Sequence, residues 1–188
     1  GDNIDEIAAT LADNLGYVVL KDHSTDKTDF QNGLKDRVIC YIFMHGVTDE
    51  KNVFIGPKVD TYFWQYLETA IFKPSDVPAN LSYKLVFFNA CFSADMKFGS
   101  NATGFAQAFG LLPHNGAYLG WTWGIWETNA EHFSAKFFEY LNTKPGKAPP
   151  KIFEAALDAS REVSTKEPFG MGDYSIMGNA AISIDMKK

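Results

Sequence analysis

Two unbroken apolar runs constrain the fold of this 188-residue chain more than any other feature. Residues 38–44 read Val-Ile-Cys-Tyr-Ile-Phe-Met, and residues 85–88 read Leu-Val-Phe-Phe. A strand with one face in water alternates apolar and polar side chains, whereas a strand covered on both faces does not. Both runs therefore predict buried strands of a parallel sheet. Residues 117–123 predict a third strand of the same kind.

Segments with helical periodicity lie between and around these apolar runs. Apolar residues recur in them at intervals of three and four, which is the spacing of one face of a helix. The expected helices span residues 4–15, 26–34, 62–72, 102–111, 129–141 and 151–163, and two further short strands are expected at residues 17–20 and 180–184. Strands that alternate with helices predict an α/β fold with a mostly parallel sheet and helices on both faces, connected by right-handed crossovers.

The length and composition fit one globular domain that spans residues 1–188. Of all residues, 46% are hydrophobic and 15% are aromatic, so the chain can bury a core and does not belong to the disordered class. The formal net charge is −6, and the sequence contains no cluster of Lys and Arg that would hold phosphates. We therefore expect no nucleic-acid partner.

The motifs also exclude several kinds of site. The longest apolar run, residues 38–44, is far shorter than the roughly 18 residues of a bilayer-spanning helix, so we expect no membrane partner. The glycines follow no phosphate-binding pattern, and Cys40 and Cys91 lie in no metal-binding spacing, so we expect no cofactor and no metal. The cellular compartment stays open, as does a pro-segment or an additional domain beyond this sequence.

Two of the predicted buried strands end in residues that can carry out nucleophilic catalysis. His45 and Gly46 follow the first apolar run, and Cys91 comes shortly after the second. The carboxyl ends of parallel strands meet at one edge of a sheet, and neighbouring strands lie about 4.8 Å apart, so we expect His45 and Cys91 to be neighbours. An imidazole can take the proton of a cysteine thiol and can return a proton to a leaving amine.

The backbone beside these residues can supply a further catalytic element. Gly46 has no Cβ, so its backbone can approach a substrate closely, and its N–H group together with that of Cys91 can point at a developing oxyanion. Taken alone, each side chain has a simpler interpretation, because free cysteines are often buried and a histidine at a strand end is usually a surface or hydrogen-bonding residue. Their joint position at two strand ends favours a functional role.

The sequences at the two strand ends resemble a family of cysteine peptidases. They read Tyr41-Ile-Phe-Met-His45-Gly46 and Leu85-Val-Phe-Phe-Asn-Ala-Cys91-Phe-Ser93-Ala94. A strand ending in His-Gly, followed by a strand ending in Ala-Cys-x-Ser-Gly/Ala, is similar to the caspase, gingipain, legumain, metacaspase and clostripain group, clan CD. The order of the motifs downstream is similar as well, over about residues 7–184. The resemblance implies a single caspase-hemoglobinase-like domain.

The same resemblance implies a cysteine endopeptidase that acts on protein or peptide substrates through a Cys-His dyad. Cys91 would attack the scissile carbonyl and His45 would protonate the leaving amine, without a third orienting acid. In relatives, the side chain accepted at P1 is selected by a residue two positions before the nucleophile and by another in the loop after the first strand. These positions correspond to Asn89 and Asp22.

Asn89 departs from the family pattern, because trypsin-like relatives tend to carry an acid there. A neutral amide can only hydrogen-bond, whereas Asp22 can still supply the charge that attracts a basic P1 residue. The sequence therefore favours a basic P1 residue only weakly. Trp121 and Trp123 are expected to wall the same pocket, although two tryptophans at alternate positions are equally typical of a core.

Two other functions stay open at this point. The first is a catalytically inactive caspase-like scaffold or binding module, against which the presence of both Cys91 and His45 argues. The second is a flavodoxin-like binder of a small ligand or a flavin that would use the tryptophans as stacking groups, and it lacks a phosphate-binding loop. His23, which also follows a strand, is a rival base, and Cys40 within an apolar run is expected to be inert packing.

Overall fold

The computed structural model describes residues 28, 31–32, 34, 38–43, 45–48, 53–56, 72–94, 101–112, 115–142, 146–165 and 173–184. The chain divides into two compact units. We call residues 22–124 and 173–179 the sheet unit, and residues 1–21, 125–172 and 180–188 the helical unit. The expectation of one domain over residues 1–188 stays a prediction.

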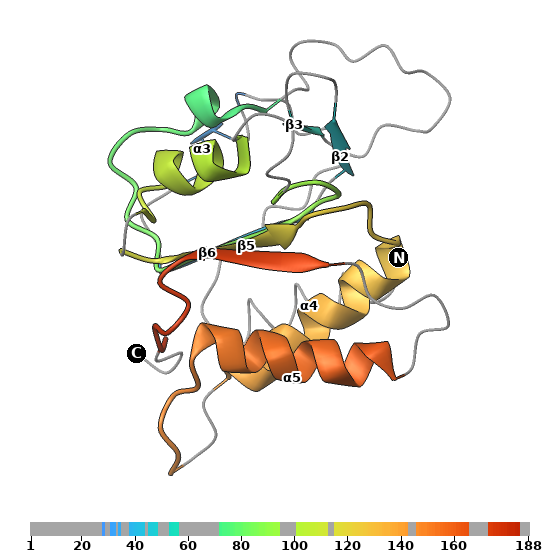
Figure 1. The fold of residues 1–188 in the computed structure, drawn as a ribbon. Coiled ribbons are helices and arrows are strands. Elements are labelled where there is room, and N and C mark those ends of the chain that lie inside the picture. The colour runs from blue at the N-terminus through green and yellow to red at the C-terminus, as the bar shows by residue number, and fades with distance from the viewer. Residues whose placement is uncertain are drawn as a thin grey trace. The chain divides into compact units, whose positions relative to one another are not determined.

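The sheet unit is built on a four-stranded open sheet. Its strands, in order across the sheet, are β1 (Ile39–Phe43), β4 (Leu85–Asn89), β5 (Ala117–Trp121) and β6 (Tyr174–Gly178). β1, β4 and β5 are parallel, and β6 runs antiparallel beside β5 (Figure 1). Every residue of β4 and β5 is buried, as their unbroken apolar runs predict. The α/β class, the mostly parallel sheet and the three predicted strands are therefore confirmed, although Tyr41 and Phe43 of β1 are only half-buried.

The last strand does not lie where the sequence predicts it. Residues 180–184 contain only an isolated bridge, and the strand is β6, at residues 174–178. The carbonyl groups of Ala180 and Ile182 accept hydrogen bonds of 3.1 and 3.0 Å from the first N–H groups of α5 (Ile152–Ser164). The backbone carbonyls of this apolar segment thus cap the N-terminus of a helix. They find hydrogen-bond donors there, as they would in a sheet. The side chains of β6 are only half-buried, so no apolar run marks it.

Two short strands form a second, antiparallel sheet that the sequence analysis did not predict. β2 (His45–Thr48) and β3 (Val53–Gly56) pair with His45 opposite Gly56. The chain passes from β1 into β2 within two residues, so His45 begins a new strand rather than a loop. β2 contains no apolar run and β3 only residues 53–55, which is shorter than the runs of about four or more residues that indicate a strand.

The hydrophobic core of the sheet unit includes one face of the sheet and α3 (Asn101–Ala108). Alternate residues of three strands supply the sheet side of this core: Cys40, Ile42, Val86, Phe88 and Tyr118. The ring of Phe105 in α3 packs 5.2 Å from that of Phe88. The short helix η2 (Pro74–Asp76) lies beside α3 and contacts it at Gly104.

α3 ends before its predicted boundary at residue 111 because of a glycine. Gly110 has a φ of +70°, a left-handed conformation that glycine adopts without steric cost. The N–H groups of Gly110 and Leu111 donate hydrogen bonds of 2.9 Å to the carbonyls of Gln107 and Ala106. This is the pattern of a Schellman motif, which closes a helix.

The helical unit contains α4 (Glu127–Leu141) and α5, which lie side by side (Figure 1). Both confirm the helices predicted at residues 129–141 and 151–163. Lys136 Nζ lies 2.7 Å from Glu139 Oε2 and 3.2 Å from Glu162 Oε1, and the Tyr140 hydroxyl donates a 2.8 Å hydrogen bond to Glu162 Oε2. Hydrogen bonding to Glu139 raises the pKa of Lys136, and hydrogen bonding to Glu162 raises that of Tyr140.

The remaining predicted elements are only partly described. Residues 4–15 and 17–20 lie outside the described residues, and of residues 62–72 only Phe72 is described. Within residues 26–34, the described Thr28, Gln31 and Asn32 are helical, and Leu34 is not.

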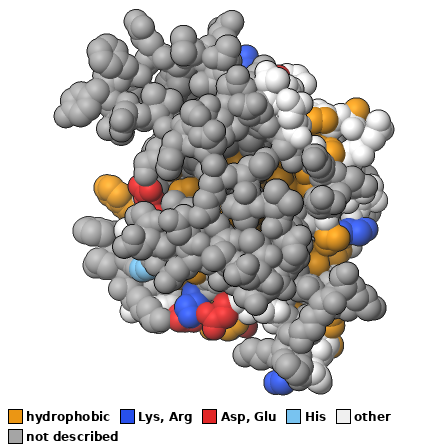
Figure 2. Space-filling model, turned by 180° about the vertical axis from the view of Figure 1, so that it is seen from behind, with side chains coloured by type: hydrophobic (Ala, Val, Ile, Leu, Met, Phe, Trp, Pro, Cys, Tyr) orange, Lys and Arg blue, Asp and Glu red, His pale blue; other side chains and the backbone are white. Residues whose placement is uncertain are grey.

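The described surface carries charges of both signs. Figure 2 shows acidic and basic side chains lying next to one another on the face that it presents. Among the residues that the structure describes, no helix is both long enough and apolar enough to cross a membrane.

Candidate functional site

Cys91 lies in a tight turn, residues 91–94, just after β4. Its side chain is half-buried. The next residue, Phe92, has a φ of +59°, which is an outlying conformation for a bulky residue. The N–H of Phe92 donates a 3.2 Å hydrogen bond to the carbonyl of Trp123, and the N–H of Ala94 donates a 2.8 Å bond to that of Trp121. The turn is thus held against the end of β5.

Ser93 holds the turn in place through three hydrogen bonds to β4 and β5. Its hydroxyl donates a 2.7 Å bond to the carbonyl of Phe88 and accepts a 3.0 Å bond from the backbone N–H of Trp121. Its own carbonyl accepts a 2.8 Å bond from the hydroxyl of Tyr118. Burial raises the pKa of Tyr118 well above its ordinary value, so that hydroxyl stays a donor. One side chain therefore connects the Cys91 turn to β4 and β5.

A glycine inside β5 makes room for this serine. A Cβ atom at Gly120 would lie 2.6 Å from Ser93 Oγ. In the sequence, Ser93 stands out only as part of the Ala-Cys-x-Ser motif, with no role of its own, and Gly120 carries no prediction. The available signal was the glycine itself, because a glycine within an apolar strand often marks a close approach of another segment.

Removal of the Ser93 hydroxyl is expected to destabilise the fold. Ser93→Ala takes away the acceptor of the buried Trp121 N–H and a donor to the Phe88 carbonyl, which should lower the free energy of unfolding by about 2 kcal/mol. Ser134, equally buried, donates a 2.7 Å hydrogen bond to the Ala130 carbonyl, four residues earlier in α4. A carbonyl within a helix already accepts a hydrogen bond from the backbone N–H four residues later. Ser134→Ala should therefore lower the free energy of unfolding by less than about 1 kcal/mol. Urea unfolding of both variants measures the difference, and equal losses would contradict this account.

The structure brings Gly46 directly against Cys91. A Cβ atom at Gly46 would collide with the carbonyl oxygen of Cys91, and it would lie 2.7 and 2.9 Å from the carbonyl carbon and the nitrogen of that residue. Only a glycine leaves space for this backbone contact. The segment that begins with His45 and the Cys91 turn therefore meet, 46 positions apart in sequence. The side chain of His45 lies outside what the structure describes.

The other predicted site residues lie in contrasting surroundings. Asn89 is 1% exposed, and Trp121 is fully buried. Their side chains are hydrogen-bonded to each other, with the indole N–H of Trp121 donating to Asn89 Oδ1 over 2.6 Å. Trp123 is 48% exposed, and its backbone carbonyl holds the Cys91 turn. Asp22 and the rival base His23 lie outside the described residues.

Cys40 is buried within β1, in agreement with its expected role in packing. Burial raises the pKa of its thiol from 9.0 to about 12, although a hydrogen bond with Tyr83 acts in the opposite direction. The thiolate is the reactive form of cysteine, so Cys40 is unreactive at neutral pH in the folded chain. Of the two thiols, only Cys91 is available for chemistry.

The buried thiol of Cys40 should make stability depend on alkaline pH. Its pKa is higher in the folded chain than in the unfolded one, so its contribution is fully present below about pH 9 and is lost as the pH rises toward 12. Between pH 8 and pH 10 the free energy of unfolding should fall by about 1.4 kcal/mol more in the parent chain than in Cys40→Ala. Denaturant unfolding at both pH values measures this, and identical pH dependences would refute it.

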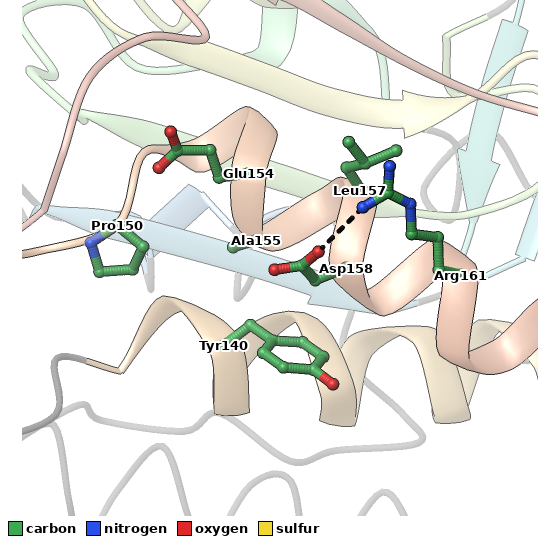
Figure 3. A pocket seen from close by; sticks show the side chains of 7 residues that line it. All are labelled: Tyr140, Pro150, Glu154, Ala155, Leu157, Asp158 and Arg161. Carbon is green, nitrogen blue, oxygen red and sulfur yellow. Dashed lines mark ion pairs between the residues drawn. The ribbon is translucent and has the colours of Figure 1, made fainter.

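A separate cavity of about 330 Å³ lies in the helical unit, between α4 and α5. Its walls are formed by Tyr140, Pro150, Glu154, Ala155, Leu157, Asp158 and Arg161 (Figure 3). Arg161 pairs with Asp158 over 3.5 Å, and both side chains are largely exposed, so this pair contributes little. No residue of the predicted site lines this cavity. Within the described ranges, no group of three or more His, Cys, Asp or Glu side chains is placed to hold a metal ion.

Comparison with known proteins adds no assignment. No protein-family model matches the chain, and no curated protein matches it.

Proposed function

We propose that this protein is a cysteine endopeptidase with a caspase-hemoglobinase-like fold, in which Cys91 is the nucleophile and His45 is the general acid and base. The observation that carries the proposal is the backbone contact between Gly46 and Cys91. This contact places the His45–Gly46 segment at the turn that presents the half-buried thiol. A nucleophile and a base need this proximity to act together.

The proposed reaction follows the chemistry of acyl transfer. The Cys91 sulfur forms a bond to the scissile carbonyl carbon, and the N–H groups of Gly46 and Cys91 would stabilise the negative charge on the carbonyl oxygen. His45 takes the thiol proton and returns it to the leaving amine as the peptide bond breaks. Water, deprotonated by His45, then attacks the thioester, which releases the second product and regenerates the thiol.

The substrate class proposed here is a peptide or protein with a weak preference for a basic P1 residue. That preference depends on Asp22, since Asn89 carries no charge and Trp123 can supply only an aromatic wall. The half-exposed Trp123, next to the Cys91 turn, is the described side chain that suits such a wall best.

A labelling experiment tests the proposal. The intact mass of the protein is measured after exposure to a panel of peptidyl chloromethyl or acyloxymethyl ketones that differ only in the P1 residue. An endopeptidase should gain one label on Cys91, with a rate that depends on P1, and His45→Ala should lose most of that label. If Cys91 reacts with every ketone no faster than a free peptide thiol does, the endopeptidase proposal fails and the inactive binding module is favoured.

A further inference from the structure

Asn89 connects three neighbouring strands through one side chain. It is the last residue of β4 and is almost completely buried. Its amide nitrogen donates a 3.1 Å hydrogen bond to the hydroxyl of Tyr41 in β1. Its amide oxygen accepts the 2.6 Å bond from the indole of Trp121 in β5. We call Tyr41, Asn89 and Trp121 the strand-end clamp.

The chemistry of the strand-end clamp suits an amide in particular. One end of a side-chain amide donates hydrogen bonds and the other accepts them, so Asn89 can serve a hydroxyl and an indole N–H at once. A leucine of similar size offers neither function. A carboxylate can accept but cannot donate, and its burial is costly. Two engaged amide ends and an exposure of 1% leave a substrate almost no surface of Asn89 to contact.

The strand-end clamp joins the two segments on which the proposed chemistry depends. β1 leads within two residues to His45, and β4 leads within two residues to Cys91. The two strands are also in register here, with Phe43 opposite Asn89. The bond between Tyr41 and Asn89 therefore holds the strand that supplies the base to the strand that supplies the nucleophile.

We propose that Asn89 is a positioning residue for the Cys91–His45 pair and that it does not read the P1 side chain. This inference rests on the proposed endopeptidase function. Trp121 then belongs to the same clamp, because its indole N–H donates to Asn89 Oδ1, and it does not wall a pocket. Selection of P1 is left to residues outside the clamp.

Two variants of the full chain test the positioning role with the ketone panel and with a cleavable peptide. Asn89→Leu removes both hydrogen bonds, whereas Tyr41→Phe removes one hydroxyl and keeps the ring. Each should slow the labelling of Cys91 about tenfold or more with every P1 residue, because small displacements of reacting groups are costly. The order of preference among P1 residues should not change, and kcat should fall while KM stays constant. Tyr140→Phe, which removes a hydroxyl in the helical unit, is the matched control and should label like the parent.

A third variant separates positioning from substrate contact. If Asn89 read the P1 side chain, Asn89→Asp would speed labelling by Arg or Lys ketones relative to the others. The positioning role predicts slower labelling with no such gain. A tenfold gain for basic P1 residues would overturn the inference, and so would Tyr41→Phe labelling at the parent rate. A parent chain that no ketone labels would instead refute the proposed function, and this inference with it.

Discussion

Replacement of Cys91 by alanine is expected to abolish peptide cleavage, with a loss of at least about 10³-fold in kcat/KM. The proposed reaction begins with a bond between the Cys91 sulfur and the substrate carbonyl, and alanine has no group that can form it. The other thiol cannot take over, because Cys40 is buried in β1 with a pKa of about 12. Hydrolysis of the best peptide from the ketone panel, linked to a fluorogenic leaving group, measures the loss.

Cys40→Ala is the matched control for this experiment. It removes the second thiol from the chain and should leave kcat/KM within about threefold of the parent, since Cys40 lies within the core rather than at the Cys91 turn. A Cys91→Ala variant that kept more than a tenth of the activity would show that another group is the nucleophile.

Replacement of Gly46 by alanine should have the second-largest effect. The added Cβ would occupy the space of the Cys91 carbonyl group. The position of a Cβ is fixed by its own backbone and the carbonyl is itself backbone, so neither can rotate away. The two segments must separate, and a displacement of about 1 Å at reacting groups can lower a rate by about 10²-fold. Forced overpacking should also lower the free energy of unfolding by about 1–3 kcal/mol. Ketone labelling of Cys91 and thermal unfolding measure the two effects.

Gly124→Ala provides the comparison for Gly46→Ala. Among the described residues, the ring of Phe92 is the one that a Cβ atom at Gly124 would meet, at an ordinary contact distance of 3.8 Å. This variant should fold and label like the parent. Parent-like behaviour of Gly46→Ala in both measurements would contradict the close contact on which the proposed function depends.

The parts of the fold that could be predicted are those whose burial leaves a clear pattern of apolar residues in the sequence. β4 and β5 are buried at every residue, so their sequences carry no alternation and indicate a covered parallel sheet. α4 and α5 are long enough for helical spacing to be unmistakable. The apolar pattern of residues 180–184 predicts a strand, yet of these residues only Ile184 is buried, and the half-buried β6 carries no such pattern. Strand pairing depends on which backbone groups find partners, and an apolar pattern does not show this.

The candidate site could be predicted in part for a related reason. Strand ends of a parallel sheet converge, so the meeting of the His45–Gly46 segment with Cys91 follows from two apolar runs and their last residues. The strand-end clamp could not be predicted from the sequence, because it depends on the directions in which the side chains of Tyr41 and Asn89 point across the sheet. The resemblance to the peptidase family implies that Asn89 contacts the substrate, and its burial suggests a different role.

The hydrogen bonds of Ser93 also have a consequence for the motions of the molecule. Local openings of a native protein are easiest where backbone groups are exposed and contacts are few. The Cys91 turn is instead connected to β4 and β5, whose residues are all buried. The turn should therefore open together with the central strands rather than fray on its own. Heating should then disrupt the nucleophile and the sheet in a single cooperative transition.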